Sequence, residues 1–135
     1  MWAKIWDKRR DIALWALTAL AAAAFVAAGA LKLVGADFEV EAFRNWGYPA
    51  WFRIAVGLVE VAAGIALLIP RVATAAAAAL SLIMVGAIGT HVAYGEWAQA
   101  LVPVVFLAAL GWIGYERRPE GIEQRLHQPA WSHRA

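Results

Sequence analysis

Four long apolar runs, separated by short polar segments, dominate this chain. They occupy residues 12–34, 50–69, 72–93 and 97–115, and each has close to the ~20 residues that an α-helix needs to cross a bilayer core. A chain that is 63% hydrophobic and 16% charged is also too apolar for an ordinary soluble domain. The sequence therefore predicts an all-α fold, an integral membrane four-helix bundle in contact with the lipid bilayer.

The polar segments at the two ends indicate the orientation. Residues 1–11 form a basic N-terminus and residues 116–135 a polar tail, on either side of a transmembrane domain at 12–115. Nine of the 12 Lys and Arg residues lie in these ends and in the 70–71 turn. By the positive-inside rule, both termini are cytoplasmic and the number of spans is even. A cleaved signal peptide fits less well, because the first apolar run has 23 residues and signal h-regions have about 7–15.

Residues 35–49 are too polar to span a bilayer and too aromatic for a free linker. Phe38, Phe43, Trp46 and Tyr48 alternate there with charged residues, a pattern typical of an interfacial helix. We predict a short interfacial helix between helices 1 and 2 of the bundle, ended by Gly47. It would form a lid over the outer end of the bundle.

A carboxylate, Glu60, lies near the midpoint of the second apolar run. A charge at that depth costs on the order of 3 kcal/mol, so a compensating partner is expected. Arg53, Gly57, Glu60 and Gly64 follow one another at spacings of 4, 3 and 4 residues and share one helix face. Because glycines permit close approach of a second helix and charges avoid lipid, this face is predicted to point into the protein.

Further polar residues of the same half of the bundle extend this face into a candidate site. Lys32, on a small-residue face of the first helix, either turns inward toward Glu60 or extends to the lipid headgroups. Pro103 frees a backbone carbonyl at a similar depth. A polar pocket formed by these residues could bind a quinone or pass a proton to it. The alternative is that the charged residues form an ion pair that only orders the bundle. The predicted site consists of Lys32, Arg53, Glu60 and His91, and its rim of Trp46, Thr90, Glu96 and Gln99.

Several kinds of chemistry are excluded by what the sequence lacks. There is no cysteine, which removes disulfides, thiolate metal sites and dithiol chemistry. No zinc-protease, P-loop or nucleophile-elbow motif occurs, and no pair of intramembrane histidines is spaced to hold a haem. We predict no metal site and no cofactor other than a quinone. The basic residues follow the membrane topology, so nucleic acid is not expected as a partner.

Four motifs occur in a distinctive order: Gly29-x-x-Lys32, Trp46-Gly47-Tyr48-Pro49, Gly57-x-x-Glu60-x-x-x-Gly64, and a histidine near the end of the third membrane helix. Over residues 27–115 the chain thereby resembles the DoxX and DoxX-like family of small four-helix bacterial membrane proteins. The resemblance implies a multi-pass protein of the bacterial cytoplasmic (inner) membrane, with the family's charged positions at Lys32 and Glu60. It also implies association with oxidoreductase systems, since one branch is a subunit of a thiosulfate:quinone oxidoreductase. More distant eukaryotic relatives act as membrane chaperones or cargo receptors.

These observations together predict a membrane-embedded component of a quinone-linked oxidoreductase system. Glu60 would accept a proton or bind the ligand, and Lys32 and Arg53 would hold it ionised. Because the chain alone does not look like a self-sufficient redox enzyme, a redox partner protein is expected. A homo-oligomer through the alanine-rich faces of the first and third membrane helices is a further hypothesis. The alternative function is a non-catalytic membrane scaffold, chaperone or binder of small hydrophobic ligands.

Overall fold

The computed structural model describes residues 2–119, and every regular element in this range is helical. The all-α prediction is confirmed for this part of the chain. Residue 1 and most of the predicted tail, residues 120–135, lie outside the described residues. The five helices are α1 (Trp2–Val34), α2 (Asp37–Asn45), α3 (Ala50–Ala66), α4 (Ala73–Ala93) and α5 (Trp97–Glu116).

The four apolar runs of the sequence correspond to α1, α3, α4 and α5, with differences at their ends. α1 begins at Trp2 rather than at residue 12, because the charged stretch before the apolar run contains no glycine or proline to interrupt a helix. α3 ends at Ala66 rather than at residue 69, since Leu68 and Ile69 donate to carbonyls three residues back and tighten the chain before Pro70. α4 begins and α5 ends within one residue of the predicted bounds.

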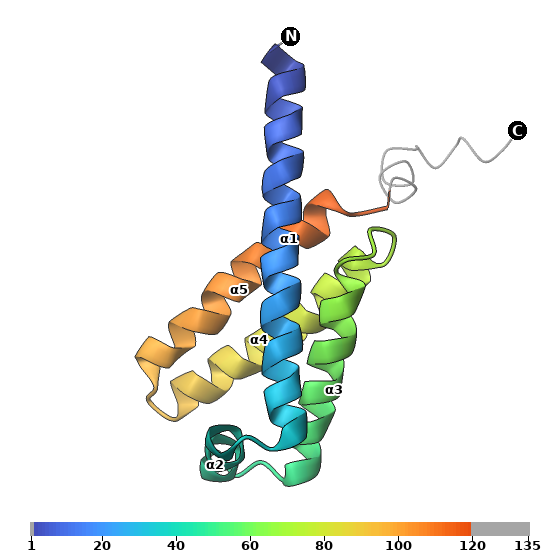
Figure 1. The fold of residues 1–135 in the computed structure, drawn as a ribbon. Coiled ribbons are helices and arrows are strands. Elements are labelled where there is room, and N and C mark those ends of the chain that lie inside the picture. The colour runs from blue at the N-terminus through green and yellow to red at the C-terminus, as the bar shows by residue number, and fades with distance from the viewer. Residues whose placement is uncertain (1, 120–135) are drawn as a thin grey trace, which may run out of the picture.

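The short helix predicted within residues 35–49 is present as α2. Gly47, predicted to end it, follows the C-cap residue Trp46 and has a φ of +77°, in the left-handed region that glycine adopts most readily. α2 contacts α1 and α3, and it lies at the end of the molecule opposite the N-terminus (Figure 1). It is therefore placed to cover one end of the space between the longer helices.

The longer helices pack as two pairs, α1 against α3 and α4 against α5. The pairs meet through contacts of α3 with α4 and of α1 with α5. Figure 1 shows that the N-terminal part of α1 extends beyond the other helices. The core between the pairs is built mainly from aliphatic side chains and one phenylalanine: Leu14, Phe25, Leu67, Leu80, Leu110 and Ile113.

Glycines bring α1 and α3 into direct backbone contact. A Cβ atom added at Gly29 would lie 2.6 Å from the carbonyl oxygen of Gly57, and one added at Gly57 would lie 2.9 Å from the carbonyl oxygen of Gly29. One added at Gly64 would come within 3.1 Å of the Val26 side chain. No larger residue fits at Gly29 or Gly57 without moving the helices apart. This confirms the prediction that the glycine face of α3 points into the protein.

Three helices of the described range, α1, α4 and α5, are long and apolar enough to cross a membrane. α3 is shorter, with 17 residues that span roughly 26 Å. Large apolar side chains cover the outside of these helices, and Leu20, Leu82 and Val105 are 69%, 75% and 67% exposed. An apolar surface of this extent is stable in lipid and not in water. The chain is therefore a membrane protein with lipid-facing apolar helices.

Candidate functional site

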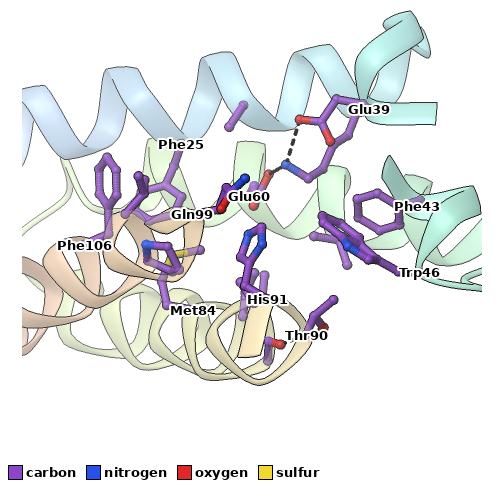
Figure 2. Close-up of a pocket in the computed structure, with 18 of the residues that line it drawn as sticks. Phe25, Glu39, Phe43, Trp46, Glu60, Met84, Thr90, His91, Gln99 and Phe106 are labelled. Atoms are coloured by element: carbon purple, nitrogen blue, oxygen red, sulfur yellow. Dashed lines mark hydrogen bonds and ion pairs between the residues drawn. The ribbon is translucent and has the colours of Figure 1, made fainter. Parts of the chain in front are cut away.

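A cavity of about 680 Å³ lies between the helices, lined by residues of all five helices and of the loop between α2 and α3. The rings of Phe25 and Phe106 meet edge to face in its lining, with centroids 5.2 Å apart. Figure 2 shows these rings and Met84 gathered toward one end of the cavity, and Glu39 and Trp46 toward the other. Most of the lining is apolar, including Phe25, Val56, Ile83, Met84, Val102 and Phe106.

Three charged side chains meet at the wall formed by α1, α2 and α3. The Nζ atom of Lys32, in the last turn of α1, lies 3.1 Å from Glu60 Oε2 and 3.3 Å from Glu39 Oε1. Gly29 and Gly57 are each three residues before one member of the Lys32–Glu60 pair, so the backbone contact of α1 with α3 sets this separation. Of the two alternatives for Lys32, the structure has the inward one.

Glu60 is almost completely buried, with 3% of its surface exposed. Its Oε2 atom forms the ion pair with Lys32, but no hydrogen bond of good geometry reaches this oxygen. Oε1 has no hydrogen-bond partner among residues 2–119 either. A carboxylate has room for about four hydrogen bonds. Glu60 therefore lines the cavity with most of its accepting capacity unused.

A second polar group, at the end of α4, is centred on His91. Its Nδ1 atom lies 2.7 Å from Glu96 Oε2, and Trp46 Nε1 donates to the two oxygens of the same carboxylate at 3.4 and 3.3 Å. The Trp46 ring also stands edge-on against the imidazole, with centroids 5.3 Å apart. These contacts fix the ring of His91, whose Nε2 has no hydrogen-bond partner among the described residues.

Hydroxyl groups fasten the loop after α2 onto α4. Tyr48 Oη and Thr90 Oγ1 are 2.8 Å apart, and Thr90 also donates to the carbonyl of Gly86 at 2.9 Å. Tyr94 Oη donates to the carbonyl of Trp46 at 2.8 Å. Because Tyr48 and Trp46 both line the cavity, this loop closes one end of it.

Arg53 does not belong to the cavity, contrary to its prediction as a site residue. Its Nη1 atom donates to the backbone carbonyl of Lys32, at the carboxyl end of α1. Helical side chains lean toward the N-terminus of their helix, and Arg53 precedes Glu60 by two turns. It therefore points away from Glu60 and toward the electronegative end of α1, which attracts a cation. The shared helix face was predicted correctly, but the pairing of Arg53 with Glu60 was not.

The other predicted residues gather as follows. Lys32, Glu60 and His91 line the cavity, as do the rim residues Trp46, Thr90 and Gln99. Glu96 lies behind His91 and holds it rather than lining the cavity itself. Pro103, singled out by its position inside α5, is buried in the lining.

Sequence reasoning missed Glu39 and the aromatic walls. Glu39 is seven residues after Lys32 and on a different helix, so no helical spacing relates the two. The acidic residues in the first turn of α2, Asp37 and Glu39, were a usable signal, since a lysine near the end of the preceding helix needs a counter-ion. Phe25 and Phe106 gave no signal, because they come from helices far apart in sequence and look like ordinary apolar residues. Residues 2–119 contain no group of three or more His, Asp or Glu side chains that could hold a metal ion.

Comparison with known proteins adds one match. The family model described as "DoxX-like family" matches residues 16–113, which is more than half of the chain. The match includes Lys32, Glu39, Glu60 and His91. No curated protein and no solved structure matches the chain.

Proposed function

The chain belongs to the DoxX-like family, and from this premise we propose that it is a membrane-embedded component of a quinone-linked oxidoreductase system. In this proposal the cavity binds a quinone or quinol, and Glu60 is the group that binds the ligand head or accepts its proton. Electrons would come from or pass to a redox partner protein.

The observation that carries this proposal is the composition of the cavity. Its volume of about 680 Å³ is in the range of small-molecule sites, which are apolar with a few polar groups that orient the ligand. A quinone has the matching chemistry, with an apolar ring, a lipid-soluble tail and two oxygens. The Phe25 and Phe106 rings suit the apolar part, and Lys32, Glu60 and His91 suit the polar part.

Each polar residue has a proposed role that follows from its contacts. Lys32, 3.1 Å from Glu60, stabilises the carboxylate form of that residue. Glu96, 2.7 Å from His91, orients the imidazole so that Nε2 is available to the second oxygen of the ligand. Gln99 adds an amide that has no hydrogen-bond partner among residues 2–119. Arg53 has a structural role at the junction of α1 and α3.

The proposed setting is a four-helix bundle in the bacterial cytoplasmic membrane. α1, α4 and α5 are long enough to span it, and α3 becomes a fourth span when the turn after Ala66 is counted. Both termini would be cytoplasmic by the positive-inside rule, which places α2 on the opposite side. A homo-oligomer would use the alanine-rich faces of α1 and α4, and cross-linking in membranes that yields monomer alone would contradict it.

The test is a thermal-shift titration of detergent-purified protein with duroquinone and with duroquinol. We expect a saturable stabilisation of about 2 kcal/mol at roughly 30-fold excess over the dissociation constant. Ala87→Phe places a ring in the cavity and should abolish the shift, because Ala87 is part of the lining. Ala78→Phe, the same change at an exposed position of α4, should leave it intact.

One observation favours the second candidate function, a non-catalytic membrane scaffold or chaperone. Lys32 pairs with both Glu39 and Glu60, so this cluster connects α1, α2 and α3 without any ligand. If wild-type protein shows no shift with either compound and Glu60→Gln only lowers the melting temperature, the scaffold is the better account.

A further inference from the structure

We infer that the cavity selects ligands whose polar head donates a hydrogen bond, so that it binds the quinol or phenol form in preference to the quinone. This inference rests on the proposed function and names the ligand class of the same site. The feature that carries it is the buried and under-bonded carboxylate of Glu60, facing a cavity whose lining is mostly apolar.

Glu60 needs a donor that the described residues do not supply. It is 3% exposed, and neither of its oxygens accepts a hydrogen bond within residues 2–119. Its single polar partner, Lys32, is shared with Glu39 at 3.3 Å. A buried acceptor left without a partner is unfavourable by the full cost of its desolvation. A hydroxyl group of the ligand would meet this requirement.

The balance of charge in the lining points the same way. Lys32 faces two acidic side chains, Glu39 and Glu60, so one cation is shared between two acceptors. An anionic head, or a carbonyl oxygen placed against Glu60, would meet an acceptor with another acceptor. A neutral hydroxyl donates a hydrogen bond to the carboxylate and adds no charge to the mostly apolar cavity.

The second polar group is compatible with either form of the ligand. His91 has Nδ1 engaged by Glu96 and Nε2 open, and an imidazole nitrogen donates or accepts according to its tautomer. Discrimination between quinol and quinone therefore depends on Glu60 and not on His91. Glu60→Gln replaces a group that only accepts with an amide that both donates and accepts, so it should remove the preference.

The experiment compares three probes of the same shape on the purified protein: duroquinol kept reduced under nitrogen, duroquinone, and the dimethyl ether of duroquinol. The ether retains the ring and both oxygens but cannot donate a hydrogen bond. We expect duroquinol to bind at least about tenfold more tightly than the other two, the effect of one hydrogen bond to a charged group. In Glu60→Gln the three affinities should fall within about threefold of one another. Glu41→Gln, the same change at an exposed position of α2, should keep the wild-type order.

The outcomes separate this inference from the function on which it rests. Equal binding of duroquinol and its ether, or tighter binding of duroquinone, overturns the donor preference and leaves a ligand site in place. A preference that persists unchanged in Glu60→Gln also overturns the assignment to Glu60. Absence of binding by all three probes overturns both the inference and the proposed function.

Discussion

At the residue scale, the fold is arranged around a carboxylate that should be unfavourable where it lies. Glu60 sits in an apolar helix with 3% of its surface exposed, and one lysine shared with Glu39 compensates it. Breaking a buried ion pair by removing one member is far more costly than the net stability that the pair provides. Lys32 is therefore the residue on which both the stability and the electrostatics of the cavity depend.

The first prediction concerns this lysine. Lys32→Met should lower the free energy of unfolding by about 3–5 kcal/mol, because it leaves the buried carboxylate of Glu60 and the half-buried one of Glu39 without a cation. Reversible unfolding in mixed detergent measures this change. Lys4→Met removes the same charge from an exposed part of α1 and should change stability by less than about 0.5 kcal/mol. An equal effect of the two substitutions would show that the ion pairs do not stabilise the fold.

The second prediction concerns Arg53, which donates to the carbonyl of Lys32 and does not line the cavity. Arg53→Gln should reduce stability by about 1.5–3 kcal/mol, the contribution of a hydrogen bond from a charged group. The affinity for duroquinol should stay within about threefold of wild type. A loss of affinity comparable to that of Glu60→Gln would contradict the position of Arg53 outside the cavity and would support a role for it in ligand binding.

The sequence carries enough information to place Glu60 on an inward face and to name Lys32 as a candidate partner, with the lipid headgroups as the alternative for Lys32. Both predictions follow from glycines three or four residues away, because small residues allow two helices to approach closely. It does not carry the direction of Arg53, since a long flexible side chain can reach groups on either side of its own turn. Nor does it reveal Glu39, whose nearness to Lys32 depends on how α2 folds back after the turn at Gly35.

At the element scale, the contact of α1 with α3 is the junction that builds the site. Gly29 and Gly57 bring the two backbones together, and Lys32 and Glu60 follow three residues later on each helix. A change that separates the helices would thus also separate the ion pair. The predicted helix order and glycine face were confirmed, but the end of α3 was not, because the turn before Pro70 tightens three residues earlier than the apolar run ends.

The third prediction follows from this junction. Gly29→Ala should destabilise the protein by about 1–3 kcal/mol, because the added methyl group would lie 2.6 Å from the Gly57 carbonyl oxygen and the helices must shift. Gly111→Ala in α5 is the control, since a Cβ there meets nothing within 4 Å. Unfolding in mixed detergent compares the two variants. A neutral Gly29→Ala variant would contradict the close contact of α1 with α3.

At the scale of the whole molecule, the helices form a lipid-facing shell around a space large enough for a small molecule. This shell could be predicted from the apolar runs. In lipid the backbone N–H and C=O groups must bond to one another, and a long apolar segment achieves this by forming an α-helix. A polar pocket was predicted, but the size of the cavity and its mostly apolar lining could not be, since they depend on how side chains from all five helices meet.

The fourth prediction concerns the orientation of this shell, and the absence of native cysteine makes it simple to test. In intact spheroplasts a membrane-impermeant maleimide should label Glu41→Cys in α2 and should not label Lys8→Cys near the start of α1. After permeabilisation both should react, because both positions are exposed. Labelling of Lys8→Cys in intact spheroplasts would contradict the proposed topology. It would mean that the orientation is reversed or that both ends of α1 lie on the same side of the membrane.

The central claim, that the cavity around Glu60 holds a lipophilic ligand, is tested most directly by photolabelling the protein in membranes with an azidoquinone and mapping the modified residues. The account predicts saturable labelling of cavity residues such as Met84 and Phe106, prevented by excess duroquinol and by Ala87→Phe but not by Ala78→Phe. Labelling confined to lipid-facing residues such as Leu20 and Val105, unaffected by duroquinol, would contradict it.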